Sequence, residues 1–372
     1  MNLNSLRNEI SAIDEEILRL FIKRMGICGD VASHKIENKL PVFQSERERE
    51  IIKKVRDASP EWLKNSAEVL FNSIMDISKC KQQQQIFSKY NNTDRAVFSP
   101  EKILKIGCQG TQGAYSHTAA QKLFTNAENE ISFFETFEDV FSAVNSDEIE
   151  FGLLPIQNST AGSVYQTYEL LRKYELFISA SVSVKVSHCL CVKKGSGISD
   201  ISKVFSHEQA LLQCSDFIKE NGLEPVSYPN TALAGEFVKD KNGCAAICSE
   251  ECAMLNGLDI LNRCISNADE NYTRFICVSK KIFLSENADI ISVSLSLPHM
   301  PSALYRLLTK FSVIGLNLLR IESKPIASKD FDVIFYLDFE GSIKQPEVLQ
   351  IIEALKSELS YFKFLGNYSE VK

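Results

Sequence analysis

The chain has 372 residues, of which 44% are hydrophobic, and its formal net charge at pH 7 is −7. This length exceeds one ordinary hydrophobic core, and the apolar content is sufficient for two or three. The negative charge argues against a nucleic-acid-binding surface. An anionic ligand would therefore have to be met by local Lys and Arg side chains.

The N-terminal stretch and the cysteines indicate a cellular compartment. The opening sequence MNLNSLRNEISAIDEE carries several acids and lacks the apolar run of a signal peptide. No later stretch approaches the roughly 18 apolar residues that a membrane-spanning helix needs. Eleven cysteines without paired CxxC spacing predict free thiols in a reducing cytoplasm.

Three cysteines, Cys244, Cys248 and Cys252, are spaced like one face of a helix, which would suit a metal ion. The stretch GCAAICSEE, however, has the pattern of a strand that runs into a helix, and this would break that face. We therefore expect buried thiols rather than a metal site.

Residues 1–88 have the pattern of an all-α domain. Apolar residues recur in steps of three and four from Leu6 to Val31, and the same stripe includes Arg24. The pattern holds for about 35 residues, or roughly 50 Å of helix, which is more than a three-helix domain can cover. We expect another subunit to cover this helix. Pro41 should end it, a second helix should span residues 46–56, and a third should begin at residues 59–61.

The next two regions have different patterns. Residues 89–102 are polar and turn-rich, which is typical of a linker. In residues 103–281, five apolar runs each end in small polar residues and lead into a helical pattern, which predicts an α/β domain with parallel sheets and a ligand site beyond the strand ends. Residues 289–370 have the order βαββαβ, which is typical of a small ferredoxin-like α+β domain.

The apolar stripes of residues 1–88 carry several charged and polar side chains. Each of them alone would usually be an edge residue that extends to water. Several cations on stripes that must be buried need an anionic partner, because unpaired buried charge is costly. A small dicarboxylate would satisfy this set, which comprises Arg7, Arg24, Lys35, Arg47, Glu48, Ser78 and Gln82.

Sequence motifs along the chain resemble known families. LRNEISAID, SEREREII and the ending SxxxQ resemble the all-helical chorismate mutases over residues 1–88. GTQGAYSHTAA, GLLPIQNSTAG, VFSHEQALLQC, NTALA and NYTRF resemble the two-lobed α/β prephenate dehydratases over residues 103–281. PSALY and IESKPI resemble the phenylalanine-responsive ACT regulatory domain. In this order, the three resemble the bifunctional chorismate mutase and prephenate dehydratase of phenylalanine biosynthesis.

For the mutase, the resemblance implies a site that needs neither metal nor organic cofactor, because the rearrangement is pericyclic and requires only positioning and charge stabilisation. Lys35 and Gln82 would donate to the ether oxygen of chorismate, and Glu48 would accept from its ring hydroxyl. The remaining residues would bind chorismate: Arg7 from a neighbouring subunit, Arg24, Arg47, Ser78, and Gln44, which stands where the family frequently has an acid.

For the dehydratase, the resemblance implies that Thr273 donates to the departing hydroxyl of prephenate and that Arg274 binds a carboxylate. Phe275 would pack on the ring or anchor the loop. His207 is either a general acid or a helix cap. The other expected prephenate-binding residues are Ser116, Asn158, Ser159, Thr160, Ser206 and Thr231. Gln157 and Thr111 depart from the family, which usually has Glu and Pro there.

For regulation, the resemblance implies an L-phenylalanine site in a homodimer or higher homo-oligomer. The expected effector-binding residues are Ser302, Ala303, Leu304, Glu322, Ser323, Lys324 and Pro325. Ser302 stands where the family usually has Gly, and Lys324 where it usually has Arg. Two other hypotheses stay open: an active mutase with a weakened dehydratase, and an aromatic amino-acid sensor on inactive enzyme folds. The sequence leaves the oligomer number, substrate channelling and a role for tyrosine undecided.

Overall fold

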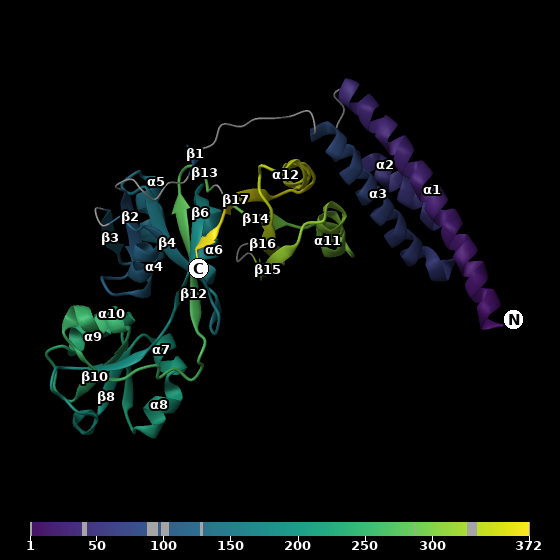
Figure 1. Ribbon diagram of the computed structural model, residues 1–372. Coiled ribbons are helices and arrows are strands. Elements are labelled where there is room, and N and C mark those ends of the chain that lie inside the picture. Colours follow the sequence, from purple (N-terminus) through teal and green to yellow (C-terminus); the bar gives the residue numbers. More distant parts are fainter. Residues whose placement is uncertain are drawn as a thin grey trace. The chain divides into compact units, whose positions relative to one another are not determined.

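The computed structural model describes residues 2–38, 43–87, 96–97, 104–126, 129–285, 287–325 and 333–371. The chain forms two compact units, Met1–Asp94 with Asp289–Phe364, and Arg95–Ala288 with Leu365–Lys372 (Figure 1). The expected helix end at Pro41 lies outside the described residues, as does most of the expected linker. Within the described ranges, no helix is both long enough and apolar enough to cross a membrane.

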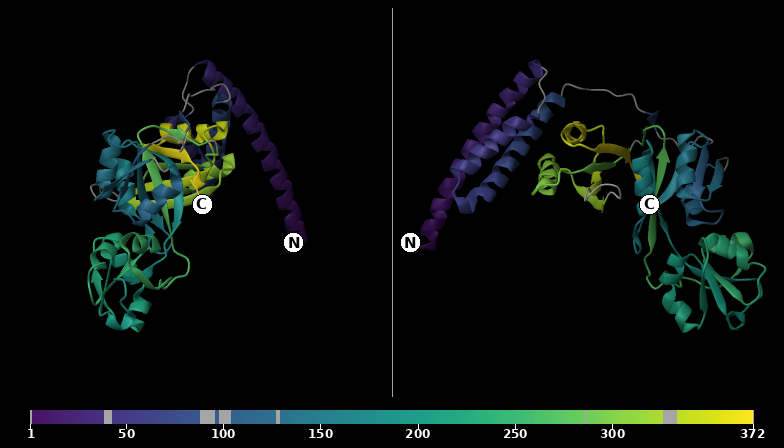
Figure 2. Two further views of the ribbon diagram at one scale, coloured as in Figure 1. Left: turned by 60° about the vertical axis from the view of Figure 1, so that its left-hand side comes forward. Right: turned by 180° about the vertical axis from the view of Figure 1, so that it is seen from behind.

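The first unit begins with a helical segment, which we define as residues 2–87. Its elements are α1 (Leu3–Glu37), α2 (Ser45–Ala58), the short 3-10 helix η1 (Glu61–Leu63) and α3 (Lys64–Phe87). Both α1 and α2 pack on α3, and the first turns of α1 extend past α3 in each view (Figures 1 and 2). The predicted long first helix and the helix start after Pro60 are confirmed.

The C-terminal segment, residues 289–364, completes the first unit. Its elements are β14 (Ile290–Ser296), α11 (Ala303–Ile314), β15 (Leu318–Pro325), β16 (Val333–Glu340), α12 (Pro346–Glu358) and β17 (Phe362–Tyr368). The strand order is β15-β16-β14-β17, and β16 is antiparallel to both β14 and β15. Both helices of this segment contact α3. The βαββαβ order expected from the sequence is therefore present.

The second unit has two lobes (Figure 1). The first lobe is built on a sheet of order β6-β12-β4-β2-β3. Its strands are β2 (Lys105–Gln109), β3 (Glu130–Phe134), β4 (Phe151–Asn158), β6 (Phe177–Lys185) and β12 (Tyr272–Ser279), and the short strands β5 (Gly162–Ser163) and β18 (Glu370–Val371) pair with β4 and β6. The short strands β1 (Ala96–Val97) and β13 (Phe283–Leu284) form a separate two-stranded parallel sheet. Its helices are α4 (Tyr115–Leu123), α5 (Phe137–Asn145) and α6 (Tyr165–Lys173).

The second lobe has a smaller sheet of order β11-β7-β10-β8-β9. Its strands are β7 (Cys189–Val192), β8 (Lys203–Ser206), β9 (Glu224–Ser227), β10 (Cys244–Cys248) and β11 (Asp259–Asn262). Its helices are η2 (Ile198–Asp200), α7 (Glu208–Gln213), α8 (Ser215–Glu220), α9 (Thr231–Val238) and α10 (Glu250–Asn256). The chain enters this lobe after β6 and leaves it before β12.

The predicted strand-to-helix junctions are confirmed, but the prediction of parallel sheets is wrong because both sheets are mixed. In the first lobe, β2 is parallel to β3 and β4, whereas β12 is antiparallel to β4 and β6. In the second lobe, β7 is antiparallel to β10 and β11. The chain passes from the first lobe to the second after β6 and returns at β12. Because β12 re-enters the first sheet without the helical crossover that a parallel strand requires, it pairs in the antiparallel direction.

The core of the second lobe decides between a metal site and buried thiols for Cys244, Cys248 and Cys252. The stretch around Cys244 is a strand that leads into α10, as the sequence predicts. Cys248 and Cys252 are fully buried there among alanines, Val238 and Leu258. All eleven cysteines are free thiols. Cys248 and Cys252 act as small apolar groups, as expected, whereas Cys244 is only partly buried.

Candidate active sites

A cavity of about 110 Å³ lies among the three helices of the helical segment. Seven of the eight residues that the resemblance to chorismate mutases assigns to the chorismate site line it: Arg24, Lys35, Gln44, Arg47, Glu48, Ser78 and Gln82. Sequence analysis missed Lys79, which also lines the cavity and is 5% exposed. A lysine next to the predicted Ser78 on α3 was the available signal. The structure thus collects four cations and one carboxylate around one small space.

The positive charge of this cavity is local, because the whole chain is negative. Burial lowers the pKa of the Lys35 ammonium, while the charges of Cys28 and Glu48 oppose that effect. Lys35 donates from Nζ to Oε1 of Gln82 over 3.2 Å. Since an ammonium group only donates, this contact turns the oxygen of Gln82 toward Lys35 and leaves the amide N–H groups able to donate to a ligand.

Arg24 is held by α3 across the cavity. Its Nη1 donates to the hydroxyl of Ser78 and, over 3.4 Å, to the carbonyl of Ile74. The Ser78 hydroxyl in turn donates to the same carbonyl over 2.6 Å. The guanidinium is therefore fixed beside the cavity before any ligand arrives.

Arg7 is the one predicted residue that does not line this cavity. It is exposed near the start of α1, about 25 Å from Arg24 at 1.5 Å of rise per residue. The apolar stripe predicted on α1 is exposed as well, with Ile10, Ile13 and Ile17 each at least 57% accessible. The structure therefore leaves uncovered the face that the sequence predicts to be buried.

A larger cavity, of about 460 Å³, lies between the two lobes of the second unit. Six of the predicted residues line it: Ser116, Asn158, His207, Thr231, Thr273 and Phe275. They come from both lobes, from the ends of strands and the starts of helices, as expected for an α/β ligand site. Helices α4 and α9 begin at the cavity wall, where a helix N-terminus favours an anion, and Asn230 caps α9 by accepting from the N–H of Leu233 over 2.7 Å.

Thr273 lies at the end of a directed series of hydrogen bonds. The backbone N–H groups of Thr160 and Ala161 donate to Oδ1 of Asn158 over 3.0 and 2.7 Å, which fixes the orientation of that amide. Nδ2 of Asn158 therefore donates to the Thr273 hydroxyl over 2.9 Å. Because Thr273 accepts this bond, its own O–H remains available to donate.

The same series continues toward a buried histidine. The Thr160 hydroxyl donates to Asn158 over 2.8 Å and accepts from Nε2 of Gln213 over 2.8 Å. Oε1 of Gln213 lies 3.1 Å from Nε2 of His188. His188 is only 2% exposed, and burial lowers its pKa despite the bond to Gln213, so the ring stays neutral. A neutral ring protonated at Nε2 donates to Oε1 of Gln213 and so completes the series of hydrogen bonds.

Sequence analysis missed several residues that line this interlobe cavity. They are Gln109, Tyr115, His188, Gln209, Gln213 and Asn230. His188 precedes a buried strand rather than a strand-to-helix junction, so the pattern used for prediction did not find it. Gln213 was within reach, because it lies in the quoted VFSHEQALLQC motif.

Four predicted residues do not line the cavity. Arg274 lies on the opposite face of β12 from Thr273, and its Nη2 donates to the Tyr368 hydroxyl over 3.0 Å. Ser206 is fully buried and donates to the carbonyl of Ile247 over 2.6 Å. Ser159 bonds to the backbone of Tyr272, and Thr160 acts through Asn158 as described. Their substrate contacts stay predictions.

His207 caps a helix, as one of its two expected roles requires, and its general-acid role stays a prediction. Its ring lines the interlobe cavity, and its Nδ1 accepts from the backbone N–H of Gln209 over 3.3 Å. The second contact caps α7. Gln157, the amide that departs from the family, pairs in register with Arg274 on the neighbouring strand and does not line the cavity.

The predicted effector-binding residues lie on two elements of the C-terminal segment. Ser302 precedes α11 with a φ of 67°, and Ala303 and Leu304 form its first turn. Residues 322–325 form the end of β15, where Glu322 accepts from Arg320 over 3.5 Å. The left-handed conformation of Ser302 explains why glycine would be favoured there.

Family models match both parts of the chain that contain these cavities. The chorismate mutase type II family model matches residues 6–83, and the prephenate dehydratase model matches residues 106–282. A bifunctional chorismate mutase/prephenate dehydratase from Aquifex aeolicus (strain VF5) is 29% identical over 98% of this chain and 97% of its own length. An arogenate dehydratase/prephenate dehydratase 2, chloroplastic, from Arabidopsis thaliana is 30% identical over 82% of this chain and 84% of its own. The chain belongs to the bifunctional chorismate mutase/prephenate dehydratase family.

A solved structure supports the fold of the dehydratase part. It is a prephenate dehydratase from Arthrobacter aurescens in complex with L-Phe, which is 27% identical, with a TM-score of 0.67 over 72% of this chain and 90% of that chain. The helical-segment cavity is hereafter the mutase site, and the interlobe cavity is the dehydratase site.

The first prediction tests the polarity of the Asn158–Thr273 bond. Asn158→Asp replaces the donating amide by an acceptor, so the Thr273 hydroxyl should turn to donate to the carboxylate. We expect dehydratase kcat to fall by about 10²-fold or more, as for loss of one preorganised donor. Thr273→Ala should lower dehydratase kcat by a similar factor, and Thr273→Ser should recover part of the rate. Ser199→Ala, at an exposed serine of η2 that is neither in the series nor at the cavity, is the control. Full kcat in Asn158→Asp with an unchanged melting temperature would contradict this assignment.

Proposed function

We propose that this protein converts chorismate to prephenate at the mutase site and prephenate to phenylpyruvate at the dehydratase site. The observation that carries the proposal is the meeting of the separately predicted residues around one cavity in each unit. Neither reaction requires a metal or an organic cofactor in this proposal.

At the mutase site, the residues bind a dianion and stabilise its rearrangement. Arg24 and Arg47 take the carboxylates, with Ser78 assisting at Arg24. Lys35 and the amide N–H of Gln82 donate to the ether oxygen, where negative charge grows as the C–O bond breaks. Glu48 and Gln44 accept from the ring hydroxyl. Since the rearrangement is pericyclic, the site gains rate from positioning and electrostatics alone.

At the dehydratase site, Thr273 donates a hydrogen bond to the departing hydroxyl of prephenate. The ring carboxylate leaves as CO₂, and its bonding electrons complete the aromatic ring as the hydroxyl departs. The N-termini of α4 and α9 receive the side-chain carboxylate. Phe275, which is 3% exposed, forms part of a dry wall for the ring. Arg274 retains its predicted carboxylate role only if it leaves Tyr368.

The second prediction tests both activities in one assay. Chorismate is added to the purified protein, and its loss is followed together with prephenate and phenylpyruvate. Lys35→Ala should lose mutase turnover by about 10²-fold or more, because it removes one preorganised donor, while dehydratase activity on supplied prephenate stays within a few-fold. Prephenate accumulation by the wild type would instead select the weakened-dehydratase hypothesis. No loss of chorismate or prephenate would select the sensor.

We further propose that a second copy of the chain covers α1 and supplies Arg7 to the mutase site. The exposed apolar stripe on α1 supports this, since such a face is normally buried. The small volume of the mutase cavity supports it as well, since small-molecule pockets usually measure about 300–1,000 Å³. An isologous pair would place each Arg7 in the partner's site.

The third prediction uses mixed dimers. Arg7→Ala and Lys35→Ala chains, each inactive as a mutase, are unfolded, mixed in equal amounts and refolded. Half of the dimers should be mixed, and one of their two sites should hold both residues, so about a quarter of wild-type activity should return. Arg24→Ala mixed with Lys35→Ala is the control, because both lie in the same cavity. Equal recovery in both mixtures, or recovery in neither, would contradict the shared site.

The C-terminal segment supports a regulatory proposal. Its element order and the strand order β15-β16-β14-β17 are those of a ferredoxin-like ACT domain, to which we assign residues 289–370. The Arthrobacter relative was solved with L-Phe bound. We propose that L-phenylalanine binds near the start of α11 and the end of β15 and lowers dehydratase activity. The free thiols support a cytoplasmic location for these reactions.

The fourth prediction concerns this effector. L-phenylalanine titrated into the full chain should release or absorb heat, and D-phenylalanine should do so weakly. Glu322→Ala should weaken binding, whereas Lys356→Ala, at an exposed position of α12, should not. Linkage requires prephenate to weaken L-phenylalanine binding by the factor by which the effector weakens prephenate. Absence of heat, or identical binding by Glu322→Ala, would remove the proposed effector site.

A further inference from the structure

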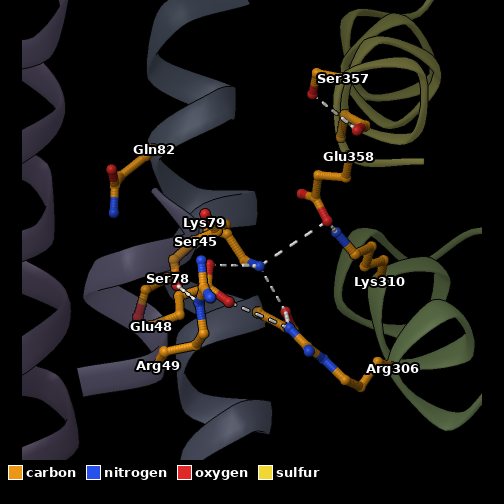
Figure 3. Close-up of polar contacts among 12 residues, drawn as sticks. Ser45, Glu48, Arg49, Ser78, Lys79, Gln82, Arg306, Lys310, Ser357 and Glu358 are labelled. Atoms are coloured by element: carbon orange, nitrogen blue, oxygen red, sulfur yellow. Dashed lines mark hydrogen bonds and ion pairs between the residues drawn. The ribbon is translucent and has the colours of Figure 1, made fainter. Parts of the chain in front are cut away.

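The mutase site is contacted by an arginine from the C-terminal segment (Figure 3). Arg306 on α11 pairs with Asp76 of α3 through two bonds of 2.9 Å, one from Nε and one from Nη2. The same Nη2 lies 3.4 Å from Oε2 of Glu48 on α2. One guanidinium thus holds carboxylates from two helices of the helical segment.

A lysine of α3 shares both carboxylates with Arg306. Nζ of Lys79 lies 3.0 Å from Oε1 of Glu48 and 2.9 Å from Oδ1 of Asp76. Glu48 is therefore held at one oxygen by Lys79 and at the other by Arg306. Because Glu48 and Lys79 both line the mutase cavity, this cluster forms part of the cavity wall.

The burial of the cluster makes its charges interdependent. Asp76 is fully buried, and the side chain of Lys79 is 6% exposed. Burial alone would raise the pKa of Asp76, but the bonds and charges of Arg306 and Lys79 outweigh it and hold that pKa below its usual value. Removing Arg306 would leave Asp76 and Glu48 to share Lys79, since a buried carboxylate cannot go unpaired cheaply.

The outer side of the cluster is tied to α11 and α12. Lys310 pairs with Glu358, which also lies 3.9 Å from Nζ of Lys79. Nearby, Nε2 of Gln350 on α12 donates to the carbonyl of Cys80 on α3, and both residues are buried. The helix that carries Arg306 is therefore itself packed against the helical segment.

We propose that Arg306 is a positioning residue for the mutase reaction, which acts by fixing the carboxylate of Glu48. This rests on the proposed function of the helical-segment cavity. Arg306 does not line that cavity, so its effect must pass through Glu48 and the shared Lys79. A site in one segment therefore depends on a side chain that lies more than 200 residues later in the sequence.

The decisive experiment measures mutase kcat and KM in the full-length chain with Arg306→Gln. We expect kcat/KM for chorismate to fall by about 10- to 100-fold, since a small misplacement of a substrate-contacting group can cost that much. Dehydratase activity on supplied prephenate should stay within twofold. Arg306→Lys should recover part of the loss, because it restores one cation. Lys356→Gln, which removes an exposed cation from α12, is the matched control and should match the wild type.

A double-mutant cycle separates positioning from general structural support. Glu48→Gln should lower mutase activity by itself, and adding Arg306→Gln to it should then cost less than twofold, because the carboxylate through which Arg306 acts is already gone. Two losses that multiply would show that Arg306 acts elsewhere, and would overturn the proposal. Thermal unfolding of each variant identifies any that fail to fold, and Arg306→Lys then carries the comparison.

The failure of this inference is distinguishable from failure of the proposed function. A wild-type chain that converts chorismate while Arg306→Gln is equally active, or more active, removes the positioning role alone. A wild-type chain that neither binds chorismate in calorimetry nor converts it removes the mutase function and the positioning role together. Reduced activity that is rescued by Arg306→Lys and absent from the Glu48→Gln background supports the proposal.

Discussion

The carboxylate of Asp76 is fully buried, and the arrangement of the first unit depends on how its charge is neutralised. It pairs with both Lys79 and Arg306, because a buried carboxylate without a cationic partner would be costly. The three helices that supply the cluster, α2, α3 and α11, must therefore keep fixed positions relative to one another. Glu48, which belongs to the mutase site, is held in place by this requirement.

In the second unit, hydrogen-bond polarity rather than charge organises the site. Two backbone N–H groups fix the amide of Asn158, and this fixes which way the bond to Thr273 runs. The donors of Gln213 and the neutral ring of His188 extend the same order into the second lobe. A hydroxyl that would otherwise rotate freely is thereby prepared to donate to a leaving group.

The two sites use different strategies because their reactions make different demands. The mutase cavity gathers Arg24, Lys35, Arg47 and Lys79 in a chain of net negative charge, which suits a dianion that needs only to be held and polarised. The dehydratase cavity has neutral walls and helix N-termini, which suit expulsion of CO₂ and hydroxide from a ring. The apolar stripe on α1 is exposed in the single chain, which is the basis for proposing that a second copy covers it.

The sequence by itself determined the helices, the strand-to-helix junctions, most residues of the mutase cavity and a minority of those of the dehydratase cavity, because periodicity and local motifs are properties of short segments. It identified Arg24 and Lys35 from the apolar stripe of the first helix, Gln82 from that of the third, and Thr273 from a strand end. It could not show that Arg274 faces away from Thr273 toward Tyr368, since the face of a strand that lines a cavity depends on its neighbours. It also missed the mixed sheets, which follow from the chain crossing twice between lobes. Only tertiary structure brought Arg306 to Asp76 and His188 to Gln213, because burial and pairing of charge arise between segments far apart in the chain.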